Sequence, residues 1–181
     1  IIDEIHSISN QVKDEIKKAL NDEKVGERIR EGFKIAILGP ANAGKSSLLN
    51  YFSKREVAIV SEIAGTTRDV IETHLNINGY PVIMSDTAGI RDAKDEIERR
   101  GIKLALKKAE DADLNIVVIE PKNGYFTGVL KGLVNSEKTI LIVNKSDLGL
   151  DSIEKELKKF NPIYISITKE TNLDQLILEI R

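Results

Sequence analysis

One stretch of the sequence, residues 39–46, constrains the fold more than any other. It reads Gly-Pro-Ala-Asn-Ala-Gly-Lys-Ser, follows the apolar run Phe33–Leu38 and leads into a helix-like stretch at 47–52. A strand, a glycine-rich turn and a helix in this order point backbone N–H groups and the positive end of a helix dipole at one place. We therefore expect a phosphate-binding loop, in which Lys45 contacts the β- and γ-phosphates and Ser46 binds Mg²⁺. The alternative is a chance match, which the flanking strand and helix patterns argue against.

The composition is typical of one α/β domain. Of 181 residues, 41% are hydrophobic but only 4% are aromatic, so the core must consist of Ile, Val, Leu and Ala, which suit a parallel sheet covered on both faces. The net charge of −2 provides no basic surplus for non-specific nucleic-acid binding, so any contact with RNA must be local or indirect. The absence of cysteine excludes disulfides and fits a reducing compartment. No apolar run approaches the ~20 residues that span a bilayer, so we expect a cytoplasmic location without membrane contact.

The first 31 residues are expected to form a helical segment or linker. Apolar residues recur there at steps of three and four, as on one face of an amphipathic helix: Ile1, Ile5, Ile8, Val12, Ile16 and Leu20. This face packs either on its own domain or within a neighbouring helical domain. Because the sequence starts without methionine, we treat the chain as a possible fragment of a longer protein. The nucleotide-binding domain is expected at residues 32–181.

A hairpin is predicted in the middle of the chain. Asn78-Gly79 separates two strand-like runs, at 70–77 and 80–85, and this dipeptide is a strong hairpin signal. The second run leads into Asp86-Thr87-Ala88-Gly89, where Asp86 can hold Mg²⁺ through water and the N–H of Gly89 can face the γ-phosphate. Before the hairpin lies a loop, Ser61–Asp69, of low helical character that can reorder around a ligand.

A base-recognition motif follows the hairpin. Short β-branched runs at 114–119 and 139–143 are typical of buried parallel strands, and the second ends in Asn144-Lys145-Ser146-Asp147. Asp147 can accept hydrogen bonds from N1–H and the exocyclic amine of guanine, which adenine cannot supply, and sites of this kind discriminate on the order of 10⁴-fold. We expect Asn144 to brace the loops and Lys145 to cover the plane of the base.

The end of the chain completes the predicted fold. A last strand at 162–165 leads into Ser166-Ile167-Thr168, a loop expected near the base, and then into a closing helix with its apolar stripe at 173–180. Repeated strand–loop–helix units with one hairpin predict a mostly parallel six-stranded sheet with one antiparallel hairpin strand and helices on both faces. In such folds the ligand lies beyond the carboxyl ends of the strands, where all the motifs fall.

The motifs together resemble those of a known family. GPANAGKS, GTTRD, DTAG, NKSD and SIT occur in this order over residues 39–168 and are similar to the guanine-nucleotide-binding loops of the translation-factor-related GTPases. IAGTTRDVIE and DTAGIRDAKDEIERRGI most resemble the G domain of the MnmE (TrmE) family of tRNA-modification GTPases. The resemblance covers nearly the whole chain. It implies a Ras-like P-loop NTPase fold and hydrolysis of GTP to GDP and phosphate, in the service of wobble-uridine modification of tRNA.

The resemblance also implies where the nucleotide and Mg²⁺ bind. Mg²⁺ is expected at Ser46, Thr67 and, through water, Asp86. The residues expected to contact the nucleotide and its cations lie in five loops: Asn42, Ala43, Gly44, Lys45, Ser46, Ser47, Ser61, Gly65, Thr66, Thr67, Asp86, Gly89, Asn144, Lys145, Asp147, Ser166, Ile167 and Thr168.

Catalysis in this family is expected to differ from that of Ras. Ile90 occupies the position at which Ras-like enzymes have the water-positioning glutamine, and its side chain cannot position a water molecule. The resemblance assigns the role to Glu98, acting through a bridging water, with Lys45 as the other catalytic residue; the alternative for Glu98 is a solvated helix acid. It also assigns K⁺, in place of an arginine finger, to four residues: Asn42, Ser61, Ile63 and Thr66.

The resemblance implies partners as well. Two G domains are expected to meet as a homodimer in the active state, and the full-length protein is expected to work with a flavin-dependent tRNA-modification partner, so that contact with tRNA is indirect. Ile167 stands where the common pattern has alanine, and we expect weaker base affinity as a result. Two alternatives stay open: a ribosome-assembly GTPase of the Era or Der type, and a nucleotide-sensing binding module with little turnover.

Overall fold

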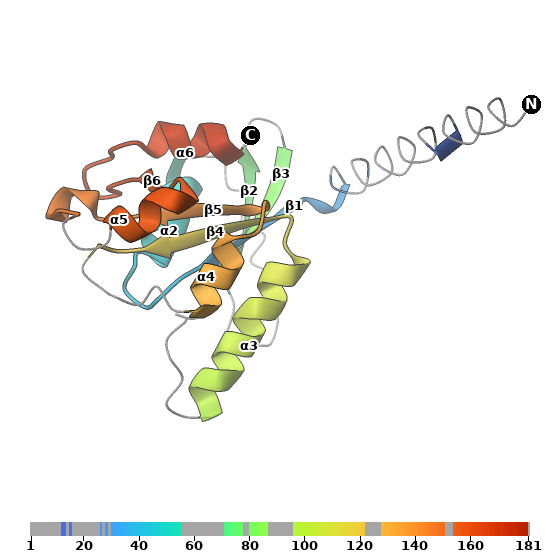
Figure 1. Cartoon of the computed structure of the whole chain (residues 1–181). Coiled ribbons are helices and arrows are strands. Elements are labelled where there is room, and N and C mark those ends of the chain that lie inside the picture. The colour runs from blue at the N-terminus through green and yellow to red at the C-terminus, as the bar shows by residue number, and fades with distance from the viewer. Residues whose placement is uncertain are drawn as a thin grey trace, which may run out of the picture.

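The computed structural model describes residues 12–13, 15, 26, 28, 30–55, 71–77, 80–86, 96–121, 128–150 and 154–180. Within these residues, six strands form one sheet in the order β2-β3-β1-β4-β5-β6 (Figure 1). The elements are β1 (Phe33–Leu38), α2 (Lys45–Arg55), β2 (Ile71–Ile77), β3 (Tyr80–Asp86), α3 (Glu96–Asp111), β4 (Leu114–Ile119), α4 (Gly128–Val134), β5 (Thr139–Val143), the 3₁₀ turn η1 (Ser146–Leu148), α5 (Glu154–Leu157), η2 (Lys158–Phe160), β6 (Ile163–Tyr164) and α6 (Leu173–Ile180).

The predicted sheet is confirmed. β2 and β3 pair antiparallel, as the Asn78-Gly79 signal indicates, and every other neighbouring pair is parallel. The last strand is shorter than the predicted run 162–165, since β6 holds only Ile163 and Tyr164. The N–H of Ile165 still donates to the carbonyl oxygen of Val143 at 2.9 Å, so the chain stays beside β5 for one more residue.

Helices cover both faces of the sheet because alternate strand residues point to opposite sides. Ile35 and Ile37 of β1 belong to the core under α2 and α6, whereas Ala36 and Leu38 belong to the core under α3, α4 and α5. Figure 1 shows α6 on one side of the sheet and α3 and α4 on the other. As the composition predicts, these cores are mainly aliphatic, and Phe52 of α2 is the aromatic side chain among the fully buried residues that the structure describes.

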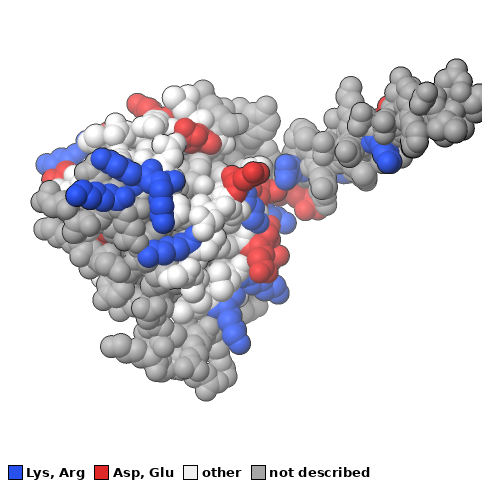
Figure 2. Space-filling view, in the orientation of Figure 1, with Lys and Arg blue, Asp and Glu red and all other residues white. Residues whose placement is uncertain are grey.

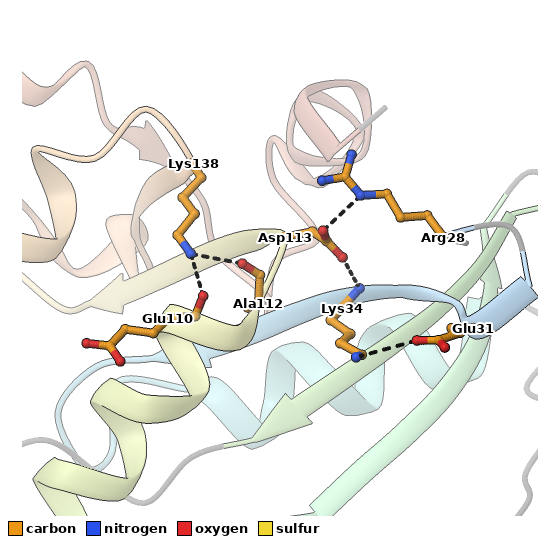
Figure 3. A network of polar contacts seen from close by, with 7 residues as sticks. All are labelled: Arg28, Glu31, Lys34, Glu110, Ala112, Asp113 and Lys138. Atoms are coloured by element: carbon orange, nitrogen blue, oxygen red, sulfur yellow. Dashed lines mark hydrogen bonds and ion pairs between the residues drawn. The ribbon is translucent and has the colours of Figure 1, made fainter. Parts of the chain in front are cut away.

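A polar network fixes the entry to β1 at the edge opposite the motifs (Figure 3). The carboxylate of Asp113 accepts hydrogen bonds from Arg28 Nε at 2.9 Å and from the Lys34 backbone N–H at 3.0 Å. The N–H of Asp113 in turn donates to the Lys34 carbonyl oxygen at 2.9 Å. Glu31 lies 4.0 Å from Lys34 Nζ, and Lys138 Nζ donates to the Glu110 and Ala112 carbonyl oxygens at the end of α3. The loop after α3 therefore ties the segment before β1 to the sheet.

The surface carries charges of both signs. Figure 2 shows Lys and Arg side chains and Asp and Glu side chains on the same face, and its described residues form no continuous basic stripe from one edge to the other. None of the helices in the described part of the chain has the length and apolar character needed to cross a bilayer. Val12, the described member of the leading apolar series, is 47% exposed.

Candidate functional site

The loop between β1 and α2 is packed tightly against the next strand. Gly39 has φ of 141°, and a Cβ atom there would lie 2.0 Å from the carbonyl oxygen of Val118 in β4. Asn42 adopts the left-handed conformation with φ of 64°, which asparagine tolerates better than most residues. Lys45 is buried, and its ammonium group donates to the carbonyl oxygen of Pro40 at 2.9 Å. The backbone of the loop is thus held by its close approach to β4 and by a hydrogen bond from its own lysine.

Asn144 joins three loops that are far apart in the sequence. Its side-chain Nδ2 donates to the carbonyl oxygen of Ala43 at 2.9 Å, and its Oδ1 accepts from the backbone N–H of Ile167 at 3.3 Å. Gly44 has φ of 101°, and a Cβ atom there would lie 2.2 Å from Nδ2 of Asn144. Only glycine leaves room for this brace. The bracing expected of Asn144 from the sequence is thus present in the structure.

Lys145 reaches from its own loop to the phosphate-loop backbone. Its backbone is left-handed with φ of 60°, and its Nζ donates to the carbonyl oxygen of Asn42 at 2.8 Å. The same ammonium group forms an ion pair with the carboxylate of Glu120. Glu120 follows directly after β4 and is 9% exposed. Sequence reasoning missed Glu120; the available signal was an acidic residue at the carboxyl end of a buried strand next to β5.

The turn that carries Asp147 and the loop at 166–168 complete the described part of the site. Asp147 is exposed in η1, and the turn is held to the end of β6 by a hydrogen bond from the Ser146 N–H to the Ile165 carbonyl oxygen at 3.0 Å. Ser166 is buried, and its Oγ accepts from the Lys169 N–H at 3.2 Å. The Ile167 side chain packs on the core that α2 and α6 cover. Its extra bulk relative to alanine is therefore accommodated in the core.

Two of the expected Mg²⁺ ligands come from neighbouring elements. Ser46 is the second residue of α2 and is exposed, as is Ser47. Asp86 ends β3 in register with Ile37 of β1, two residues before the phosphate loop begins. Serine hydroxyls and aspartate carboxylates are ligands of the kind that Mg²⁺ takes, so these residue types fit the ion.

Part of the expected site lies outside the described residues: Ser61, Ile63, Gly65, Thr66, Thr67 and Gly89. The side chains of Asp86 and Glu98 lie outside them too. The backbone of Glu98 is described and forms the third residue of α3. Thr168 is exposed in the last loop. The described part of the site thus brings together the phosphate loop, the loop at 144–147 and the loop at 166–168 at the carboxyl ends of β1, β5 and β6.

This arrangement can hold a nucleotide by both of its ends. Backbone N–H groups at the start of α2 and the buried Lys45 suit a phosphate chain. The exposed carboxylate of Asp147 suits a base with two adjacent donors. Asn144 connects the loops that would bind these two ends, because its Nδ2 donates to the Ala43 carbonyl oxygen.

Comparison with known proteins agrees with this geometry. Residues 34–169 match the family described as 50S ribosome-binding GTPase. The chain is 66% identical over 160 residues to the tRNA modification GTPase MnmE of Pelagibacter ubique, covering 88% of this chain and 36% of that protein. It is 43% identical over 183 residues to the protein of the same name from Orientia tsutsugamushi, covering 99% of this chain and 41% of that one. The chain therefore spans well under half the length of these relatives.

Solved structures give the same result for the fold. An Era variant from Aquifex aeolicus, bound to GDP and AlF₄⁻, superposes with a TM-score of 0.61 at 31% identity, covering 81% of this chain and 55% of that one. The G domain of the T. maritima iron transporter FeoB superposes with a TM-score of 0.61 at 26% identity, covering 81% of this chain and 97% of that one.

Proposed function

The chain belongs to the family of 50S ribosome-binding GTPases, and from this premise we propose that its GTP hydrolysis serves tRNA modification and is stimulated by K⁺. The observation that carries the proposal is the convergence of three nucleotide-binding loops through Asn144, in a chain 66% identical to a tRNA modification GTPase. Binding of guanine nucleotide and hydrolysis of GTP are the family's common property, and Mg²⁺ generally accompanies them.

The residues of this chain divide the work of binding. Backbone N–H groups from Ala43 to Ser46 and the Lys45 ammonium group hold the phosphates, and Asp147 accepts from guanine. Ser46, Thr67 and Asp86 would hold Mg²⁺, which neutralises charge on the β- and γ-phosphates when bound. Because positioning and electrostatics account for most of the catalysis of phosphoryl transfer, these contacts also lower the barrier.

Glu98 orients the attacking water in this proposal. Ile90 offers no hydrogen-bonding group at the position where Ras-like enzymes have glutamine. The chain does have an acid at the third residue of α3, the helix that follows the D-x-x-G motif. A carboxylate there can hold a water through a second, bridging water and so supply the orientation that the isoleucine cannot.

Four residues would hold K⁺ beside the phosphates: Asn42 of the phosphate loop, and Ser61, Ile63 and Thr66 of the loop at 61–69. A monovalent cation there supplies positive charge as an arginine finger does. The geometry of Asn42 supports this assignment. Its side chain is exposed, and its backbone carbonyl oxygen accepts a hydrogen bond from Lys145. The backbone of Asn42 thus helps to hold the loops together, while its side chain can bind a cation.

In the full-length protein, two G domains meet as a homodimer in the active state and the modification chemistry involves a flavin-dependent partner. Contact with tRNA is indirect in this proposal, since the net charge of −2 provides no basic surplus and the face seen in Figure 2 carries charges of both signs. The cytoplasm, where tRNA is available, is the proposed location. A ribosome-assembly role is the second candidate, favoured by the family's description and by the likeness to Era at 31% identity.

Phosphate release with excess GTP and Mg²⁺, in K⁺ and in Na⁺ at equal ionic strength, tests the catalytic part. We expect faster turnover in K⁺; equal rates would contradict the cation's role, and no turnover in either salt would favour a nucleotide-sensing module. Size-exclusion chromatography with GDP and aluminium fluoride in K⁺ tests dimerisation, and a monomer at all concentrations would refute it for this chain.

The biological role needs the complete gene. Deletion is expected to remove the wobble-uridine modification from tRNA, as measured by mass spectrometry of nucleosides, and a copy carrying Lys45→Ala should fail to restore it. Normal tRNA together with an accumulation of free ribosomal subunits would instead support the ribosome-assembly candidate.

A further inference from the structure

We infer that Glu120 is a positioning residue for guanine-nucleotide binding, which holds Lys145 in its binding conformation before the nucleotide arrives. The inference rests on the guanine-nucleotide binding of the proposed function and adds to it a residue outside all of the sequence motifs. It concerns the nucleoside end of the ligand and is independent of K⁺ and of dimerisation.

The contacts of Lys145 carry the inference. Its ammonium group has two oxygen partners on different elements, the Glu120 carboxylate after β4 and the Asn42 carbonyl of the phosphate loop. With its end fixed at both, the methylene stem runs from the base-recognition loop to the phosphate loop. That stem is the apolar surface on which the sequence predicts the guanine ring to lie.

Because Glu120 is largely buried, its ion pair with Lys145 is strong enough to hold the lysine side chain in place. The Glu120 side chain is 11% exposed, and a carboxylate so far removed from water is unfavourable unless a charged or hydrogen-bonding partner compensates. Lys145 is such a partner, and its own side chain is 35% exposed, so the stem keeps a surface open to a ligand. A fully exposed pair would hold the lysine only weakly.

Preorganisation is the consequence for binding. A lysine side chain has many rotamers, and ordering it costs conformational entropy. Because Glu120 and Asn42 already order Lys145 in the folded chain, nucleotide binding does not bear that cost. The contact with the base is the same for GDP, GTP and the transition state, so its loss should change affinity and KM while kcat stays constant.

Glu120→Gln tests this, because it keeps the shape of the side chain and removes its charge. We expect the Kd for GDP and for GTP to rise by the same factor, about fivefold, with KM rising similarly and kcat within about twofold. The matched control is Glu31→Gln, which removes the charge from another Glu–Lys pair at the opposite edge of the sheet and should leave Kd unchanged. Wild-type Kd and KM values for Glu120→Gln, or a fall in kcat at constant KM, would overturn the inference.

A double-mutant cycle separates positioning from a structural role. In a Lys145→Met background, Glu120→Gln should cause no further loss of GDP affinity, because the group that Glu120 positions is gone. An undiminished fivefold loss in that background would show that Glu120 acts in another way.

Chemical labelling of the wild-type chain tests the preorganisation without any substitution. In nucleotide-free protein, Lys145 should react with an amine-specific acetylating reagent more slowly than the exposed Lys155, as quantified by mass spectrometry. Equal rates would contradict the inference even if the Glu120 variants failed to fold. Absence of GDP binding by the wild type would instead count against the proposed function.

Discussion

The Asn144 side chain donates a 2.9 Å hydrogen bond to the carbonyl oxygen of Ala43, a residue 101 positions earlier in the chain. This bond joins the base-recognition loop to the phosphate loop, and both groups are buried. The Asn144 amide is therefore one side-chain tie between these loops, and the contact of Lys145 with the Asn42 carbonyl oxygen is another.

Asn144→Ala is expected to weaken both stability and binding. The Ala43 carbonyl would lose a buried donor, and leaving such a group unsatisfied costs about 1–3 kcal/mol in the free energy of unfolding. The Kd for GDP should rise at least about tenfold, because a hydrogen bond that connects the base-recognition loop to the phosphate loop is lost. Urea denaturation and calorimetric titration measure the two effects. Asn135→Ala, at an exposed turn after α4, is the control and should change neither.

Two glycines, Gly44 in the phosphate loop and Gly132 in α4, should respond in opposite ways to alanine. At Gly44, φ of 101° and a distance of 2.2 Å from the new Cβ atom to Asn144 Nδ2 make alanine strained, and the free energy of unfolding should fall by about 1–3 kcal/mol. Gly132, inside α4, has open space around its Cβ position. Alanine there should raise the free energy of unfolding by up to about 1 kcal/mol. The same sign of change for both variants would contradict this account.

Asp113→Ala is expected to loosen the entry to β1. The substitution removes the acceptor for the Lys34 N–H and for Arg28, and we expect a loss of about 1–3 kcal/mol in the free energy of unfolding. Arg28→Ala removes only the half-exposed partner, so its effect should stay below about 1 kcal/mol. Urea denaturation measures the free energy of unfolding of both variants. Equal losses would show that Arg28, rather than the Lys34 backbone N–H, is the important partner of Asp113.

Glu98→Ala tests the proposed orientation of water. Removing a group that positions or activates the nucleophile lowers turnover by about 10²–10⁴-fold, while the Kd for GTP should remain that of the wild type. Glu110→Ala, an exposed acid near the other end of α3, is the matched control and should leave kcat unchanged. A kcat for Glu98→Ala within about twofold of the wild-type value would exclude the role.

Most of the fold was predictable because its signals are local. Apolar β-branched runs and the Asn78-Gly79 turn indicated the strands and the hairpin, and all six strands are present. The short helix α5 was not predicted, since four residues carry too little periodicity to be recognised. The shortening of β6 could not be seen either, because Ile165 continues the apolar run after the ladder ends.

The nucleotide loops were predictable for a different reason. Their residue types follow from the chemistry of phosphate and guanine, so Gly44, Lys45, Asn144 and Asp147 stand out as patterns. Glu120 belongs to no pattern, because a single acid after a strand is common. Its partner is 25 residues away in the sequence, and only the parallel pairing of β4 with β5 brings the two together.

The sequence by itself thus determined which chemical groups are available and in what order the strands and loops carry them, since propensities and motifs act over a few residues. The tertiary structure decided which of these groups meet. Because β1, β4 and β5 lie side by side and parallel, their carboxyl ends share one edge of the sheet, and there Asn144 contacts Ala43 and Lys145 bridges Glu120 and Asn42.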